Sequence, residues 1–430
     1  MKSEIGIGLL GLGVVGSGVV EVLISKTDKL AKHVGASLVL KRVLMRDVSK
    51  GRAVNLGSHL LTSNVAEVLT DPEIDIVIEV IGGEHPATEY IEQAITNGKH
   101  VVTANKEVMA KHGYGLLSLA QKYNVGLRYE ASVGSGIPLI AAFQQDLASN
   151  EIWAIYGILN GTTNYILTQM AQQGLDFPSA LGQAQELGYA EPDPANDVEG
   201  IDAAYKLAIL SSLAFHSEFD PQGISCQGIS GLAAQDFRYA REFGYAIKLL
   251  AIAKRQADTV EMRVHPVFLP ENSQLAKVDG VYNAIQVEGD LAGRLVFYGE
   301  GAGALRASSA IVADVLTISR NIYRGVSNVL DVQPDWKLQI KPMSDIETRY
   351  YFRLSVIDRP GVLAQISKAL GDNFVSISSV IQKESDPLAH TAELVIMTHS
   401  AREEAVQKAL GEVKQLAVVN EVSSFVRVEG

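Results

Sequence analysis

The run Gly11-Leu12-Gly13-Val14-Val15-Gly16 has three glycines in the spacing G-x-G-x-x-G. It follows the apolar stretch Ile5–Leu10, which we expect to be a strand, and it opens an expected helix over Val14–Ser25. In that context the first glycine allows a tight turn, the second lets the backbone approach a pyrophosphate, and the third lets helix and strand pack closely. The helix N-terminus then faces the phosphates, so the motif predicts dinucleotide binding. The contacting residues would be Gly11, Gly13, Val14, Val15 and Gly16.

The end of the second expected strand, Ser37–Met45, bears on which nucleotide would bind. An acidic residue usually holds a free ribose 2′-hydroxyl there, but this chain has Arg46 followed by Asp47. An arginine suits a 2′-phosphate, which mildly favours NADP over NAD. The alternative is that Arg46 is only a solvated loop charge, and the sequence leaves both interpretations open.

A lysine follows another expected strand of the same sheet, in the run Thr103-Ala104-Asn105-Lys106. Ligands of open α/β sheets lie beyond the C-terminal ends of the strands. Lys106 could therefore reach a bound cofactor or substrate, although an ordinary surface lysine fits the position equally well.

The densest group of ionisable residues lies between Glu186 and Lys206, where six carboxylates and a terminal lysine fall within 21 residues. Pro192 and Pro194 hold the loop extended. Asp202 and Lys206 are four residues apart and so share one face of the helix that follows. An amino-acid substrate needs such a set, because carboxylates bind its ammonium group and a lysine can transfer a proton. A capping loop with one surface ion pair is the alternative.

The first third of the chain predicts the scaffold for these residues. Up to about residue 130, short apolar runs such as Asp75–Val80 and Lys99–Thr103 alternate with helical patterns such as Glu107–Lys122. Continuous apolar strands that alternate with helices indicate a parallel sheet covered on both faces. We therefore expect an α/β fold with a Rossmann-type dinucleotide-binding domain.

Two further domains are expected after it. Strand patterns at Thr259–Phe268 and Ala284–Glu288 indicate an α+β domain with a mixed or antiparallel sheet. From Arg349 the order strand, helix, strand, strand, helix, strand is the ferredoxin-like arrangement, with its second strand over Phe374–Lys383. The expected boundaries are 1–134 with a return helix at 300–325, then 135–299, a linker at 326–348, and 349–430.

Composition limits the class of protein. The 430 residues are 47% apolar and 20% charged, with a net charge of −12. These values exclude a disordered tail, a collagen-like fibre and a small disulfide scaffold. The acidic balance argues against nucleic-acid binding, and Ile5–Val20 is too short an apolar stretch to span a bilayer. A single cysteine suits a reducing compartment, so we expect a cytoplasmic protein.

Two residues of chemically versatile types are expected to be structural. Cys226 is the only cysteine and lies in no recognisable catalytic pattern, so we expect a packed thiol. His265, which precedes Pro266, is expected to be structural as well. The spacing of the histidines suggests no transition-metal site.

Several of these runs together resemble one family. The fingerprint Gly11–Gly16, Thr103–Lys106 and the acidic run Gly188–Lys206 are similar to homoserine dehydrogenase, in family order. The C-terminal unit resembles an ACT domain. With no aspartate-kinase domain ahead of it, the chain resembles the monofunctional form. Further matching runs are Asn160–Asn164, Arg263–Pro266, Gly299–Gly303 and, in the ACT-like unit, Asp358–Leu363.

The resemblance implies reversible hydride transfer between L-homoserine and L-aspartate 4-semialdehyde with NAD(P), on the route to threonine, methionine and isoleucine. By motif matching, Lys206 would donate or accept the proton at the substrate oxygen, and Lys106 would lie across the substrate and contact the cofactor. Glu191 and Asp202 would bind the substrate ammonium. Further cofactor contacts are implied at Thr103 and Gly303. A structural monovalent cation, sodium, is implied near Glu130, Val133, Ser135 and Ile137, mostly through backbone carbonyls.

The protonation of the two lysines is left open at this stage. The ordinary lysine pKa of about 10.4 is too high for an efficient base near neutral pH. A second lysine nearby would lower that pKa, whereas Glu191 or Asp202 would raise it. We prefer Lys206 as the proton donor, with Lys106 as the other candidate.

An ACT domain implies regulation by a small amino acid, and threonine is the first candidate effector. Where threonine-responsive relatives tend to read Asn-Ile-Ser-Ile, this chain has Phe374-Val375-Ser376-Ile377 with Asn373 before it. We therefore expect threonine to inhibit weakly or not at all. A homo-oligomer, dimer or tetramer, is also implied. The alternative function is a non-catalytic amino-acid sensor on a dinucleotide-binding scaffold, which would have no need of both Lys106 and Lys206.

Overall fold

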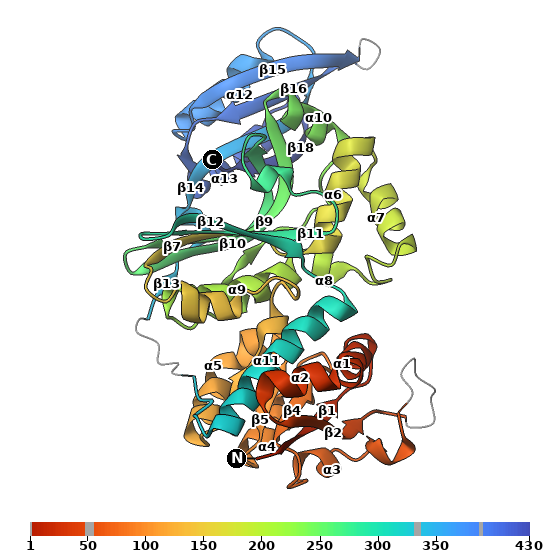
Figure 1. Ribbon diagram of the computed structural model, residues 1–430. Helices are drawn as coiled ribbons and strands as arrows, with labels where there is room; N and C mark the ends of the chain where they lie inside the picture. The colour runs from red at the N-terminus through yellow and green to blue at the C-terminus, as the bar shows by residue number, and fades with distance from the viewer. Residues whose placement is uncertain (1, 48–55, 331–336, 387–389) are drawn as a thin grey trace. The chain divides into compact units, whose positions relative to one another are not determined.

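The computed structural model describes residues 2–47, 56–330, 337–386 and 390–430, so residues 331–336 of the expected linker lie outside the description (Figure 1). The chain forms two compact units. The first consists of Met1–Ile152, Tyr205–Pro221 and Gly289–Lys337, and the second of Trp153–Ala204, Gln222–Glu288 and Leu338–Gly430. No helix of the described ranges is both long and apolar enough to cross a bilayer.

A six-stranded sheet forms the centre of the first unit, in the order β3-β2-β1-β4-β5-β6. Every neighbouring pair is parallel. This confirms the Rossmann-type parallel sheet, in which the C-terminal strand ends share one edge. The strands are β1 (Glu4–Leu10), β2 (Ser37–Leu44), β3 (Leu61–Thr62), β4 (Ile76–Glu79), β5 (His100–Thr103) and β6 (Leu127–Arg128).

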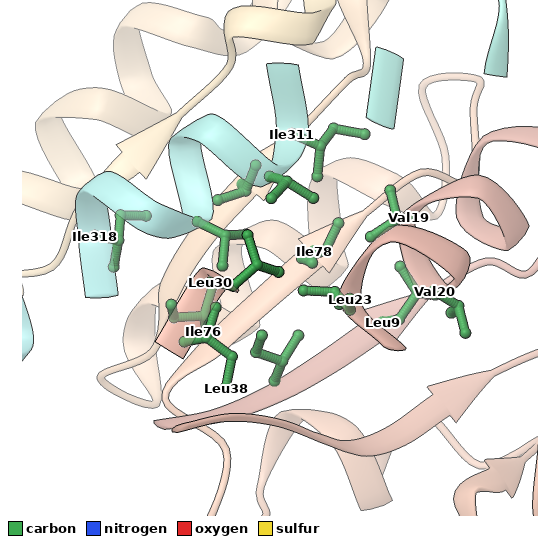
Figure 2. Close-up of a cluster of buried hydrophobic side chains, with 14 of the residues drawn as sticks. Leu9, Val19, Val20, Leu23, Leu30, Leu38, Ile76, Ile78, Ile311 and Ile318 are labelled. Atoms are coloured by element: carbon green, nitrogen blue, oxygen red, sulfur yellow. The ribbon is translucent and has the colours of Figure 1, made fainter. Parts of the chain in front are cut away.

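Helices cover this sheet, and the last of them returns from a distant part of the chain. Figure 2 shows Ile311 and Ile318 of the returning helix in one apolar cluster with Val19 and Leu23 of the first helix and Ile76 of β4. Burying these side chains attaches the returning helix to the sheet. The helices are α1 (Val14–Ser25), α2 (Thr27–Val34), α3 (Ala66–Leu69), α4 (Ala87–Thr96), α5 (Lys106–Lys122) and α11 (Ala304–Arg324).

The second unit is built on a mixed sheet in the order β11-β7-β9-β10-β18-β14-β16-β15. The strands β9 and β10 form a long antiparallel hairpin. The alternating pattern predicted the strand at Thr259 but not its partner β9. Its strands are β7 (Ile152–Ile158), β9 (Tyr245–Gln256), β10 (Thr259–Pro270), β11 (Tyr282–Gly289), β14 (Glu347–Ile357), β15 (Ile377–Asp386), β16 (Thr391–Thr398) and β18 (Val419–Val428). Shorter or outlying strands are β8 (Ser225–Cys226), β12 (Gly293–Glu300), β13 (Gln339–Ile340) and β17 (Ala401–Arg402).

The remaining elements are helical. The helices are α6 (Gly161–Gln173), α7 (Phe177–Glu186), α8 (Ala195–Val198), α9 (Ile201–Phe215), α10 (Ala234–Glu242), α12 (Val362–Asp372) and α13 (Glu403–Gln415). Short helical turns lie at Ser58–Leu60, Glu130–Ser132, Ala142–Asp146, Pro221–Gly223, Leu275–Lys277 and Met343–Asp345.

The C-terminal part has the ferredoxin-like order that the sequence predicts, β14-α12-β15-β16-α13-β18. Its strands lie side by side as β18-β14-β16-β15, and all three pairs are antiparallel. The last strand also pairs in parallel with β10, through Val267 with Arg427 and Phe268 with Val428. The ACT-like sheet and the preceding sheet are therefore continuous through β18.

The expected second strand of this domain was wrong at its start. The prediction placed it at Phe374, but β15 begins at Ile377. Phe374 has a φ of +61° and is 92% exposed. The backbone N–H groups of Phe374 and Val375 donate to the carbonyls of Gly371 and Leu370, which closes the end of α12. Satisfying those helix carbonyls takes precedence over the apolar pattern of the segment.

Candidate active site

The three glycines after β1 occupy three different environments. Gly11 has a φ of +104°, and a Cβ on it would lie 2.9 Å from the carbonyl oxygen of Val80. A Cβ on Gly16 would lie 2.1 Å from the carbonyl oxygen of Gly11, so only glycine fits between helix and strand. A Cβ on Gly13 would meet no atom within 4 Å. The first glycine turns, the third packs, and the second leaves open space where a pyrophosphate would approach.

The beginning of α1 fits a dinucleotide. Gly13 is its N-cap, its first turn carries no acidic side chain, and Val14 is 78% exposed. Unpaired N–H groups and the helix dipole favour an anion at such an end. The Gly11 N–H donates to the carbonyl of Leu44 over 3.0 Å, so the end of β2 lies against the glycine turn. The exposed Arg46 follows two residues later at the same edge, where a ribose phosphate would lie.

A buried carboxylate that the sequence analysis missed organises the neighbouring strand ends. Glu79 closes β4, is 0% exposed, and accepts hydrogen bonds from the Thr103 hydroxyl at 2.5 Å and the Ile81 N–H at 2.7 Å. Burial raises its pKa. The Thr103 hydroxyl also accepts from the Asn105 N–H at 3.0 Å. A carboxylate at the end of the apolar run Asp75–Val80 was the available signal.

Asn105, the residue before Lys106, fixes the position of Lys106 at the start of α5. Asn105 caps α5, because its Oδ1 accepts from the Val108 N–H at 3.2 Å while its Nδ2 donates to the Gly83 carbonyl at 2.7 Å. Lys106 is therefore the first residue of α5, half-buried, directly beyond the C-terminal end of β5. This is the edge where the sequence analysis expected it.

One asparagine amide holds two carboxylates of the acidic run. The Nδ2 of Asn160 donates to Asp197 at 2.7 Å and to Asp202 at 2.8 Å, and its Oδ1 accepts from the Thr163 N–H at the start of α6. Asp202 is 2% exposed, whereas Glu191 is exposed. The two predicted substrate-binding carboxylates therefore differ in burial, and Asn160 fixes only Asp202.

Lys206 lies on α9, one helical turn after Asp202, and is half-buried. The Nζ of Lys111 on α5 lies 5.6 Å from the ring centroid of Tyr205, the residue before Lys206. Residues of α5 and α9 also line one cavity of about 380 Å³, although neither Lys106 nor Lys206 is among its lining residues. The helices that carry the two lysines therefore meet, and Lys111 is about 7.5 Å along α5 from Lys106.

Gly303, where a cofactor contact was predicted, has a backbone conformation that favours glycine. Gly303 has a φ of +121° and immediately precedes α11. A Cβ there would meet only the Arg306 side chain, at 3.6 Å. The backbone at Gly303 is thus open to a ligand from one side.

Comparison with known proteins identifies the family. The family models "Homoserine dehydrogenase", "Homoserine dehydrogenase, NAD binding domain" and "ACT domain" match residues 138–316, 11–130 and 350–418. The homoserine dehydrogenase of Synechocystis is 42% identical, with 98% of this chain and 99% of that protein covered. That of Bacillus subtilis is 39% identical, with 99% and 98% covered. This chain belongs to the homoserine dehydrogenase family.

Solved structures of homoserine dehydrogenases share the fold. The Thiobacillus denitrificans enzyme is 42% identical with a TM-score of 0.92, and the match covers 99% of this chain and 98% of that one. The S. aureus enzyme at pH 7.5 is 33% identical with a TM-score of 0.79 and complete coverage of both chains. A hyperthermophilic archaeal homoserine dehydrogenase in complex with NADPH is 25% identical with a TM-score of 0.64, covering 76% of this chain and 100% of that one.

In this homoserine dehydrogenase the loop of the expected cation site is tightly folded. Both oxygens of the Glu130 carboxylate accept backbone N–H groups, from Leu139, Ile140 and Ala141, at 2.7–2.9 Å. Ser135 has a φ of +35°. No cluster of three or more His, Cys, Asp or Glu side chains that could hold a metal occurs in the described part of the chain. A cation near Glu130, Val133, Ser135 and Ile137 would therefore depend mainly on carbonyl oxygens.

The two residues expected to be structural have different surroundings in this family member. His265 is 1% exposed, accepts from Arg263 Nε at 3.1 Å, and has a pKa well below its usual value because of burial. Cys226 was predicted as a packed thiol, but the residue is exposed. It lies in the short strand β8, which pairs with Arg263 and Val264 of β10. The prediction that Cys226 is packed was therefore wrong.

Proposed function

We propose that this chain catalyses the reversible NADP-dependent interconversion of L-aspartate 4-semialdehyde and L-homoserine, with Lys206 and Lys106 at the reacting oxygen. The main support is that α5, which carries Lys106, and α9, which carries Lys206, are in contact through Lys111 and Tyr205. This contact lies in the same unit as the open glycine turn. An assay at 340 nm with homoserine and NADP tests it, and activity that needs both reactants is the expected result. Cofactor binding without turnover would favour the sensor alternative.

The bound nicotinamide would deliver a hydride to the aldehyde carbon, which leaves negative charge on the aldehyde oxygen. The Lys206 ammonium stabilises that charge and donates the proton that completes the hydroxyl group. Lys106, at the end of β5, orients the substrate and contacts the cofactor. Glu191 and Asp202 bind the substrate ammonium. In this scheme Asn160 holds Asp202 in place.

NADP is the proposed cofactor in preference to NAD. The exposed Arg46 beside the glycine turn supports this choice, because a guanidinium binds a 2′-phosphate with two hydrogen bonds. The archaeal relative whose structure is in complex with NADPH supports the same choice. A comparison of kcat/KM for the two nucleotides tests the preference.

Three further features belong to the proposal. A sodium ion near Glu130 is supported by the left-handed backbone at Gly134 and Ser135, and dialysis against a large organic cation tests it.

Weak or absent threonine inhibition is supported by Asn373, whose Nδ2 donates to Ala369 and Glu412 at 2.9 Å within its own domain. Strong inhibition at low threonine concentration would reject that part. We also propose that the protein is a homo-oligomer and that it is located in the cytoplasm. Analytical sedimentation tests the oligomeric state.

A further inference from the structure

We propose that Arg427 and Gln227 are positioning residues for the substrate loop, which we define as Glu191–Asp202. Arg427 belongs to the last strand of the ACT-like domain. It acts through Gln227 and a bridging segment, which we define as Ser225–Ser230. The inference deepens the proposed function and rests on it, because that function assigns the substrate loop to the substrate ammonium.

The guanidinium of Arg427 is fixed before it reaches Gln227. Arg427 is 7% exposed, and its Nε and Nη2 donate to the Glu403 carboxylate at 2.9 Å and 2.6 Å. That carboxylate also accepts from the Tyr350 hydroxyl at 3.0 Å and from Gln407 at 2.8 Å. A bidentate pair of this kind sets the plane of the guanidinium. The remaining nitrogen, Nη1, donates to Gln227 Oε1 at 2.8 Å.

The bridging segment is held on the edge of β10. Ser225 and Cys226 pair in parallel with Arg263 and Val264, and the Gln227 N–H donates to the Val264 carbonyl at 2.8 Å. The Gln227 residue is exposed. Its hydrogen bond to Arg427 is therefore the contact that fixes its side chain from the ACT-like domain.

Beyond Gln227 the bridging segment contacts the substrate loop directly. The Ile229 N–H donates to the Val198 carbonyl at 2.9 Å, and the Ser230 hydroxyl donates to Glu199 at 3.2 Å. A Cβ on Gly228 would lie 2.6 Å from the Val198 carbonyl oxygen and 2.4 Å from the Glu199 carboxylate. The two stretches of backbone are thus too close for any side chain between them.

The contacted residues lead directly into the helix with the reactive groups. Gly200 has a φ of +83°, and its carbonyl accepts from the Ala204 N–H at 3.0 Å within the first turn of α9. Asp202 is two residues further on, and Lys206 is one turn beyond it. Only Glu199 and Gly200 separate Val198, the last residue of α8, from the start of α9, so displacing Val198 displaces the first turn of α9 and Asp202 with it. The position of Arg427 therefore sets where the substrate loop presents its carboxylates.

Two substitutions of Gln227 test the inference in the full-length enzyme. Gln227→Met keeps the size of the side chain and removes the acceptor, whereas Gln227→Glu keeps an acceptor for Arg427. We expect Gln227→Met to raise KM for homoserine at least about threefold, with kcat within about twofold and KM for NADP unchanged, because ground-state binding alone is weakened. Gln227→Glu should restore the wild-type KM. Equal KM values in wild type and Gln227→Met would overturn the inference.

A pair of glycines gives a second test with a matched control. Gly228→Ala forces a methyl group against the Val198 carbonyl and should raise KM for homoserine more than Gln227→Met does. Gly231→Ala, three residues away, places its methyl group where no atom lies within 4 Å and should leave KM unchanged. If Gly228→Ala fails to fold, the Gln227 pair still decides. A wild-type enzyme without homoserine-dependent activity would instead refute the proposed function.

Discussion

Asp202 and Glu191 show how surroundings separate two residues of similar chemistry. Asn160 donates to the buried Asp202, so this carboxylate has a fixed position, while Glu191 is exposed and its backbone carbonyl accepts from Gln185. A fixed carboxylate orients an ammonium, and an exposed one can adjust to it. In the proposed mechanism Asp202 would define the substrate position and Glu191 would complete the binding.

Lys206 is the residue whose loss should affect the chemical step most. In Lys206→Ala no ammonium is left to donate the proton, so kcat should fall at least about 100-fold, the lower end for a general acid–base group. Lys122→Ala, at the far end of α5, is the control and should keep wild-type turnover. Steady-state kinetics at saturating NADPH measures both variants. Normal turnover in Lys206→Ala would reject the assignment.

Arg46 should determine the choice of nucleotide. Replacing it by alanine removes the guanidinium that would pair with the 2′-phosphate, so KM for NADP should rise about tenfold, as expected for a hydrogen bond to a charged group. KM for NAD should change little. A parallel rise for both nucleotides would mean that Arg46 only stabilises the loop.

Single residues could be predicted from sequence where their type alone carries the chemistry. The three glycines after β1 occupy the separate environments that their spacing predicts. The parts played by Glu79, Asn160 and Arg427 were missed, since each depends on a partner distant in sequence. Glu79, for example, meets Thr103, which lies 24 residues away.

At the scale of elements, the start of α1 depends on the absence of a side chain at one position. Gly16→Ala would place a methyl group 2.1 Å from the Gly11 carbonyl oxygen and push α1 away from β1. We expect NADP affinity to fall at least about tenfold, or the fold to lose about 1–3 kcal/mol, as overpacking does. Gly115→Ala, in α5 with no atom within 4 Å, is the matched control. Nucleotide titration and thermal unfolding measure both effects.

The start of β5 should make stability depend on pH. His100 accepts a hydrogen bond from the Gly126 N–H at 2.8 Å, and burial lowers its pKa to about 4. The unfolded chain keeps a pKa of about 6.5 and so binds more protons between pH 4 and 6.5. Stability should therefore be fully present above about pH 6.5 and decline as the pH falls toward 4.

The variant His100→Asn isolates this contribution, because its amide oxygen can still accept from Gly126 without titrating. Its free energy of unfolding, measured by urea denaturation, should fall less between pH 7.5 and 5 than that of the wild type. An identical decline in both proteins would show that other groups cause the acid sensitivity.

Elements with a strong periodic pattern could be predicted from the sequence, whereas the hydrogen bonds that end a helix could not. The helix expected over Val14–Ser25 has those bounds in the structure, and β10 begins at Thr259 as expected. The strand start at Phe374 was wrong, because the backbone there completes the end of α12. Apolar patterns report burial, but they do not report which hydrogen bonds end a helix.

At the scale of the whole molecule, buried ion pairs join the ACT-like domain to α10 and β10, which precede it. Arg353 of β14 pairs with Asp236 of α10 at 2.8 Å and with Glu393 of β16 at 2.9 Å. Arg263 of β10, fully buried, pairs with Glu429 at the C-terminus. Removing one partner would weaken the compensation of a buried charge, so these pairs favour one arrangement. The expected domain boundaries stay a prediction, since this sheet runs through β18 without interruption.

The central claim is that this chain moves hydride between NADPH and the aldehyde carbon of aspartate semialdehyde. The most direct test supplies NADPH deuterated at C4, with each face labelled in turn, and weighs the homoserine formed by mass spectrometry. One of the two labels should appear in the product, and Lys206→Ala should form that product much more slowly. Unlabelled homoserine from both cofactors, or no homoserine at all, would contradict the claim.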